Sequence, residues 1–233
     1  MRLVELRREI NAHADEQRAH LMQRYFKTGE GEYGHGDVFL GLSVPQIREI
    51  ARRYWDLPLT DALRLLKSKI HEERFTALVL LVHKYQKGDD ADKTRVFKQY
   101  LAHAKWINNW DLVDTSTPQI VGDWCWRHGE AQRLMRLARS RDLWERRIGV
   151  LGTFTFIRNH DLKPALEVAE ALLNDKHDLI HKAVGWMLRE AHKRQAGPIH
   201  DFLDNHAHRM PRVMLRYAIE KMSNNERRHY LSI

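Results

Sequence analysis

The segment with the sequence NNWDLVDTSTP, residues 108–118, carries the side chains best suited to chemistry. In a helix, Trp110 and Asp114 lie one turn apart and about 40° from each other around the axis, because each residue advances the helix by about 100°. They can therefore face the same atom. A fixed carboxylate and the π face of an indole both stabilise a nearby positive charge. The pair is suited to a reaction that passes through a cationic transition state.

Cleavage of an N-glycosidic bond is such a reaction, because the sugar becomes an oxocarbenium-like cation as the base departs. An alkylated purine already carries a positive charge, so it can leave without a general acid. One carboxylate is then enough. The alternative is that Asp114 caps the helix or pairs with an arginine while the tryptophans belong to the core, and the spacing alone leaves both interpretations open.

Pro118 predicts a distortion of the helix that carries this segment. Proline has no amide hydrogen, so inside a helix it leaves the carbonyl four residues earlier, that of Asp114, without its usual partner. We therefore expect the helix to be irregular next to the acid.

The composition favours a polyanionic partner. The 39 Lys and Arg residues outnumber the 31 Asp and Glu residues, which gives a net charge of +8 and makes nucleic acid the leading partner class. The single cysteine, Cys125, excludes an intramolecular disulfide and fits a reducing, cytoplasmic compartment. The N-terminus lacks an apolar leader, and the longest apolar run, residues 77–82, is too short to cross a membrane.

Apolar residues recur at helical spacing along the whole chain, with no sustained alternation, which predicts an all-α protein of about a dozen helices. A basic residue opens an apolar helix at Arg74, Arg147, Lys182 and Arg216, and the last three are 35 and 34 residues apart. Asp111 falls near the middle of the gap between the first two. This period predicts an α-solenoid of tandem HEAT-like repeats, although any helical protein can show such spacing by chance.

We expect a single domain over residues 1–233. Its N-terminal helices and a Gly-rich loop occupy residues 1–57, and the repeats occupy residues 58–233. The second helix of each repeat would face one concave wall, on which the recurring basic residues stand in a column that Arg189 extends. Such a column binds phosphates in a salt-sensitive way without reading sequence. The alternative is that these are solvated charges on ordinary amphipathic helices.

Trp186 follows Lys182 by four residues, so the repeat register places a second indole on the same wall as Asp114. A carboxylate between two indoles, inside a basic groove, is the expected result. An acid there repels the phosphates that its neighbours attract, which favours a catalytic role.

Several blocks of the sequence resemble the helical-repeat DNA alkylation repair glycosylases, the AlkD-like family. The similar blocks are NNWDLVD at 108–114, LWERR at 143–147, IHKAVGWMLRE at 180–190, and an N-terminal block over residues 25–41. The resemblance covers most of the chain. The loop TGEGEYGHGD, residues 28–37, is where we expect it to depart from the best-known members.

The resemblance implies roles for individual residues. Asp114 is similar to the family's catalytic carboxylate, and Trp110 and Trp186 are similar to the indoles that face the deoxyribose of the lesion. Arg147 is similar to an arginine that contacts phosphate, and Tyr25 to a tyrosine that contacts DNA. The implied activity is monofunctional removal of N3- and N7-alkylated purines, such as 3-methyladenine and 7-methylguanine, in base excision repair. It proceeds without flipping the base into a pocket, unlike most glycosylases.

Two other functions remain open at this point. A non-catalytic protein that binds damaged or branched DNA would keep the basic residues without needing Asp114, and a protein-interaction solenoid would bind an acidic peptide instead. We expect a monomer whose partner is double-stranded DNA, with no membrane attachment, no cofactor and no metal. His177 and His181 are four residues apart, but neither has a clear third ligand beside it.

Overall fold

The computed structural model describes residues 2–233 and confirms the all-α prediction. Helices α1 to α15 account for most of this range, joined by short 3-10 or π segments named η1 to η3. Within these residues the only extended pairing is an isolated bridge between Val38 and Ile70. Across the same range, every helix is too short or too polar to cross a membrane. The chain divides into two compact units, Met1–Ser116 and Thr117–Ile233, and the expected single domain stays a prediction.

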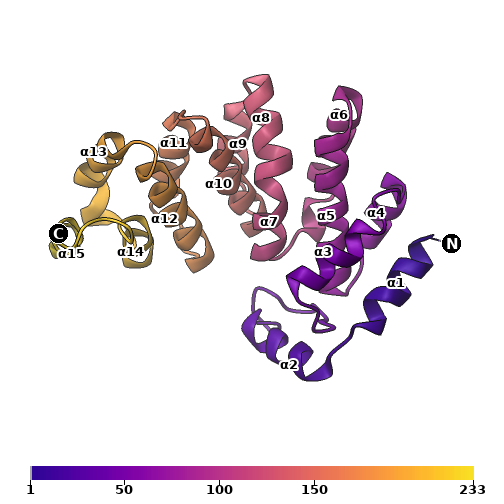
Figure 1. The fold of residues 1–233 in the computed structure, drawn as a ribbon. Coiled ribbons are helices and arrows are strands. Elements are labelled where there is room, and N and C mark those ends of the chain that lie inside the picture. Colours follow the sequence, from indigo (N-terminus) through magenta and orange to yellow (C-terminus); the bar gives the residue numbers. More distant parts are fainter. Residues whose placement is uncertain (1) are drawn as a thin grey trace. The chain divides into compact units, whose positions relative to one another are not determined.

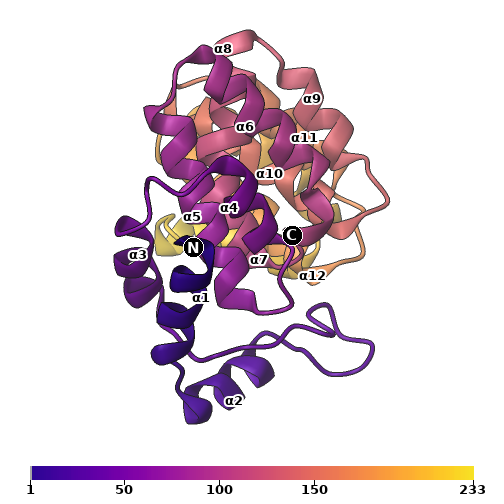
Figure 2. The same cartoon turned by 90° about the vertical axis from the view of Figure 1, so that its right-hand side faces the viewer.

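The first unit is built around one long buried helix. Its elements are α1 (Arg2–Ala12), α2 (Glu16–Tyr25), α3 (Val44–Arg52), α4 (Leu59–Leu66), α5 (His71–Lys87), α6 (Asp90–Ala102), η1 (Ala104–Trp106) and α7 (Trp110–Thr117). Helices α1, α3, α4 and α6 all pack against α5, because α5 carries a continuous buried run from His71 to Leu81. In contrast, α2 lies apart from α6 and has no buried residue (Figures 1 and 2).

The second unit consists of successive helix pairs. Its elements are η2 (Pro118–Gly122), α8 (Asp123–His128), α9 (Ala131–Ala138), α10 (Leu143–Arg158), α11 (Lys163–Ala171), α12 (Asp178–His192), α13 (Ala196–His206), η3 (Ala207–Arg209), α14 (Arg212–Ala218) and α15 (Asn224–Ser232). Helix α12 packs between α10 and α14, while α9 and α11 pack against α10 (Figure 1). The consecutive packing of α10, α12 and α14 forms one row of helices.

The helix starts define a common register for the residues predicted from the repeat. Arg147, Lys182 and Arg216 are each the fifth residue of their helices, α10, α12 and α14. Asp114 is likewise the fifth residue of α7. The repeat spacing predicts Asp111 as the counterpart of the basic residues, whereas the helix starts place that position three residues later. The acid that takes the place of a basic residue is therefore Asp114 itself.

Gly185 permits the close approach of α12 to α14. A Cβ atom at this position would lie 2.4 Å from the carbonyl oxygen of Met214 and 2.5 Å from the Cβ of Tyr217. We expect Gly185→Ala to force the two helices apart and lower the free energy of unfolding by about 1–3 kcal/mol, as overpacked cores do. Urea unfolding measures this loss.

The matched control for this prediction is Gly197→Ala in α13, where a Cβ atom would meet nothing within 4 Å. Alanine costs less entropy than glycine in a helix, so this variant should be neutral or slightly more stable. Equal stability of the two variants would contradict the predicted clash.

Candidate active site

Helix α7 presents one half-buried face and one buried face. Its half-buried residues are Trp110, Asp111, Asp114 and Thr115, and its fully buried apolar residues are Leu112 and Val113. Trp110 and Asp114 therefore lie on the same face, as the helical spacing predicted. Arg48 donates a hydrogen bond from Nη2 to Oγ1 of Thr115 at 3.0 Å, so α3 lies beside the end of this face.

The helix becomes irregular at Pro118, one turn after Asp114, which confirms the distortion predicted from this proline. A π-helical segment, η2, runs from Pro118 to Gly122. The hydroxyl of Thr155 in α10 donates to the carbonyl oxygen of Pro118 at 2.8 Å, so a side chain supplies a partner to this irregular backbone. Single π-helical turns are rare and occur frequently at functional sites.

Trp110 belongs to an aromatic cluster formed with the end of α2 and the segment after it. Its indole stacks on Phe26, with ring centroids 5.2 Å apart and planes 13° apart, and Phe26 stacks in turn on Phe39. Tyr25 meets the indole edge-on at 6.1 Å and is 68% exposed. The structure thus brings Tyr25 and Trp110 together, with the Tyr25 ring open to solvent.

A buried network of charged side chains lies beneath α7. Nε2 of His71 is 2.8 Å from Asp111 and Nδ1 is 3.2 Å from Asp37, while Arg74 pairs with Asp37 at 2.6 Å. Burial alone would lower the pKa of His71, but the carboxylate of Asp111 and hydrogen bonds to both acids raise it. Burial alone would raise the pKa of Asp37, but the hydrogen bond with His71 and the charge of Arg74 lower it. The network therefore favours an imidazolium that donates to two carboxylates.

This network fixes the start of α7. Asn109 is fully buried; it donates to Asp37 at 3.4 Å and accepts from the amide of Trp110 at 2.8 Å. Asp111, on the other side of Trp110, binds His71. Both neighbours of Trp110 are thus tied to the network, which holds the first turn of α7 and orients the face that carries Asp114.

Glu72 holds the segment that completes the aromatic cluster. Its carboxylate accepts hydrogen bonds from the amides of Leu40, Gly41 and Leu42, at 3.0, 2.8 and 3.3 Å for Oε1.

The backbone of this segment requires glycine at position 41. Gly41 has φ +91°, and a Cβ atom there would lie 2.3 Å from the carbonyl oxygen of Asp15, so only glycine fits. The segment thereby seats Phe39 on His71, with ring centroids 4.4 Å apart.

The cations predicted in the second unit differ in how far they are exposed. Arg147 is buried and donates to the carbonyl oxygen of Leu179 at 2.6 Å. Lys182 pairs with Asp178 at 2.6 Å, and Arg189 pairs with Glu220. Arg216 is exposed and has no ion pair within residues 2–233. It is therefore the member of the predicted column that is most available to a phosphate.

Trp186 lies half-buried on α12. Its Nε1 donates to Glu190 at 3.2 Å, and its ring lies 6.2 Å from that of Phe154. It belongs to the second unit, whereas Asp114 belongs to the first. The expected proximity of Trp186 to Asp114 stays a prediction.

Comparison with known proteins decides the family. The family model for DNA alkylation repair enzymes matches residues 6–222. The chain belongs to this family. Its fold is similar to that of a solved structure, a predicted DNA alkylation repair enzyme from Enterococcus faecalis, with a TM-score of 0.71 and 16% identity over 91% of this chain and 97% of that one. No curated protein matches the chain.

The structure of this DNA alkylation repair family member corrects the placement of Arg74. The repeat spacing predicts its side chain on the DNA-binding wall, but Arg74 is only 2% exposed and binds Asp37. A buried carboxylate needs a cationic partner, and Arg74 supplies it. Its guanidinium cannot also reach a phosphate outside the protein in this arrangement.

Sequence reasoning missed the other residues of the buried network in this repair-family chain. His71, Glu72, Glu73 and Arg74 open α5 as a polar quartet, and each is at most 3% exposed. The available signal was their position directly before a mostly apolar stretch of the same helix, residues 75–82, in which Thr76 is the one polar residue. A helix that is apolar on all sides is usually buried. Charged residues in the first turn of such a helix are therefore expected to be buried with it.

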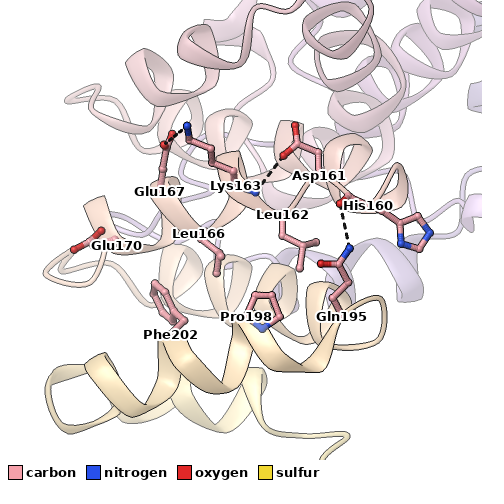
Figure 3. A pocket seen from close by; sticks show the side chains of 10 residues that line it. All are labelled: His160, Asp161, Leu162, Lys163, Leu166, Glu167, Glu170, Gln195, Pro198 and Phe202. Atoms are coloured by element: carbon pink, nitrogen blue, oxygen red, sulfur yellow. Dashed lines mark hydrogen bonds and ion pairs between the residues drawn. The ribbon is translucent and has the colours of Figure 1, made fainter.

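A hollow on the second unit lies away from the candidate residues of this repair-family chain. It is lined by residues of α11, α13 and the turns that precede them (Figure 3). Gln195 donates to the carbonyl oxygen of His160 at 3.3 Å at its rim. None of the predicted site residues lines it, so it plays no part in the candidate site.

Proposed function

We propose that this chain is a monofunctional DNA glycosylase that hydrolyses the N-glycosidic bond of N3- and N7-alkylated purines, with Asp114 as the catalytic carboxylate. Membership of the DNA alkylation repair enzyme family supports the substrate class. The observation that carries the assignment of Asp114 is its place in the register: it is the fifth residue of α7, where α10, α12 and α14 carry Arg147, Lys182 and Arg216. A carboxylate at this position repels phosphate and so weakens DNA binding. A catalytic role explains why an acid stands there nonetheless.

The reaction follows from the charge of the lesion. Alkylation at N3 or N7 makes the purine cationic, so when the bond from C1′ to the purine nitrogen breaks, the bonding electrons neutralise the departing base. Positive charge then develops on the deoxyribose. The Asp114 carboxylate and the indole of the half-buried Trp110 stabilise that charge, with Trp186 as a second indole. Water adds to C1′ and loses its proton, which leaves an abasic site.

The rigid start of α7 supports this chemistry. Electrostatic stabilisation is most effective when the charged group is held in place before the reaction begins, because no reorganisation is then needed. Asn109 and Asp111 tie the first turn of α7 to the buried network. These contacts make Asp37 and His71 positioning residues for the proposed catalytic face.

We further propose that the helix pairs are tandem HEAT-like repeats forming a basic DNA-binding groove. Tyr25 and Arg216 are the assigned DNA-contacting residues whose side chains are most exposed. Lys182 and Arg189 are held by ion pairs, so their contribution depends on exchanging those partners for phosphate. Arg147 is buried and donates to the carbonyl oxygen of Leu179, so its proposed phosphate contact also requires its side chain to move to the surface. Double-stranded DNA is the substrate, bound by a monomer without extrusion of the base.

The direct test of the activity is release of free base from duplex DNA that contains N7-methylguanine or 3-methyladenine. We expect the free purine to appear with an abasic site in an unbroken strand, and no release from an unmodified duplex of the same sequence. Strand breaks before alkali treatment would contradict a monofunctional reaction. Tight binding to the damaged duplex without any release would instead favour a non-catalytic DNA-binding protein.

Arg216→Ala should weaken binding to damaged and undamaged duplex alike. Affinity falls as salt rises, with a slope of log affinity against log salt concentration of about −0.9 per phosphate contact. We therefore expect the slope of Arg216→Ala to be less steep than that of the wild type by about 0.9. Fluorescence anisotropy over a series of salt concentrations measures it. The matched control is Arg194→Ala, which removes an exposed arginine beyond the C-terminal end of α12. A selective loss for damaged DNA would show that Arg216 does not contact the backbone.

A further inference from the structure

Three metal-ligand side chains from three different helices meet at the C-terminal end of the second unit. They are His192 in α12, His200 in α13 and Glu226 in α15, and one possible ligand atom of each lies within 4.8 Å of the other two. All three are partly exposed, so an ion can reach them from solvent. We propose that these residues bind one Zn²⁺ ion, which joins α15 to α12 and α13.

The hydrogen bonds of Tyr230 determine which nitrogen of His200 faces this site. The Tyr230 hydroxyl donates its single hydrogen to Asp204 at 2.9 Å. Its oxygen can then only accept from Nδ1 of His200, which lies 3.1 Å away. With its hydrogen on Nδ1, the neutral ring presents the lone pair of Nε2 on its other side. Metal-binding histidines usually have this arrangement: one ring nitrogen binds the metal, and the N–H of the other donates a hydrogen bond to an outer partner.

The lone pair of His200 points at another electron-rich group. Nε2 of His200 lies 3.4 Å from Oε1 of Glu226, and neither atom has a hydrogen to offer the other when the imidazole is neutral. A cation between them resolves this repulsion. Ligand atoms of a tetrahedral zinc ion with bonds of about 2.0–2.1 Å lie about 3.4 Å apart, so this pair already has the required separation.

His192 distinguishes a metal site from a simple ion pair. A protonated His200 would form an ion pair with Glu226 by itself, and that pair would not need a second imidazole. A Zn²⁺ ion, in contrast, is commonly bound by two histidines and one carboxylate, with water in the fourth position. The rings of His192 and His200 meet at 71° with centroids 5.4 Å apart. One ring nitrogen of His192 lies within 4.8 Å of the ligand atoms of His200 and Glu226, so a small adjustment of this partly exposed side chain suffices for it to bind the same ion.

Glu226 can serve as a ligand without disturbing α15. Its Oε2 accepts from the amide of Ser223 at 2.8 Å in the capping box that begins this helix, which leaves Oε1 for the ion. The three ligands are 8 and 26 residues apart along the chain, so no spacing motif announces them. The pair considered in the sequence is engaged elsewhere, since His181 is bonded to the carbonyl oxygen of Asp175 and His177 accepts from the amide of Leu179.

Isothermal titration of chelator-treated protein with ZnCl₂ tests the site, independently of the proposed glycosylase function. We expect one ion per chain and a higher midpoint of thermal unfolding when Zn²⁺ is present. His200→Ala and Glu226→Gln should each abolish both effects. Tyr230→Phe, which removes only the outer partner of His200, should weaken binding by about 10- to 100-fold.

The matched control is His208→Ala, which removes an exposed histidine of η3 in the same unit. It should leave binding unchanged. Glu226→Gln retains an oxygen that can accept from Ser223, so its circular dichroism spectrum should match that of the wild type even if His200→Ala folds poorly. A wild type that binds no Zn²⁺, or binding that Glu226→Gln leaves unchanged, would overturn the proposal.

Discussion

Asp114→Asn should reduce the rate of alkylated-base release by about 10²- to 10³-fold, the cost of removing one preorganised electrostatic contact to a transition state. The amide keeps the shape of the side chain and removes the charge that stabilises the deoxyribose cation. Single-turnover release of 7-methylguanine, with the protein in excess over the duplex, isolates this step from product dissociation.

Binding should respond in the opposite direction. Loss of a negative charge from a surface that binds phosphates removes a repulsion, so the affinity of Asp114→Asn for undamaged duplex should be equal to or higher than that of the wild type. If Asp114→Asn both bound DNA more weakly and released less alkylated base, the cause would be a folding defect, which circular dichroism would reveal.

The matched control is Asp90→Asn at the start of α6, where an exposed carboxylate is lost. It changes the net charge by the same amount and should leave base release unchanged. Release by Asp114→Asn at the wild-type rate would contradict the catalytic assignment, and the helix-capping or ion-pairing role of Asp114 would then stand.

Arg74→Met should lower the free energy of unfolding by about 3–5 kcal/mol, the typical result of removing one partner from a buried ion pair. The Asp37 carboxylate would then lose its 2.6 Å partner while its side chain remains 4% exposed. Urea unfolding measures the loss. The comparison variant is Arg64→Met, which breaks an exposed pair with Asp61 and should cost at most about 1 kcal/mol.

The pH dependence of this loss has a definite sign. The pKa of Asp37 is lowered in the folded protein, so the stability that this carboxylate contributes is present above its unfolded pKa and disappears as the pH falls through the folded pKa. Arg74→Met removes part of that contribution. The difference between wild type and variant should therefore narrow toward acid pH. A difference that stays constant, or that equals the difference for Arg64→Met, would show that Arg74 stabilises the fold through packing alone.

The same network explains why stability and activity should be linked in this protein. Arg74 holds Asp37, Asp37 holds His71 and Asn109, and these two residues hold the first turn of α7. Loosening the network would move Trp110 and Asp114 without touching either. For this reason, Arg74→Met protein that still folds should lose more of its rate of base release than of its affinity for DNA.

The sequence by itself determined the features that depend on short stretches of chain. The all-α class follows from apolar spacing, which is a property of each helix. The shared face of Trp110 and Asp114 follows from helical geometry over four residues. The irregular backbone at η2 follows from one proline without an amide hydrogen. Each of these was predicted correctly because its cause lies within one or two turns.

Only the tertiary structure decided which charges are buried and which side chains meet. Asp37, His71 and Asn109 are separated along the chain by 34 and 38 residues, and no local pattern shows that they touch. Arg74 looked like a surface cation because a sequence gives its charge but not its exposure. Likewise, the alignment of Asp114 with the basic residues required the true helix starts, and His192, His200 and Glu226 came together only through the packing of three helices. Contacts of this kind depend on the path of the whole chain, which one sequence does not specify residue by residue.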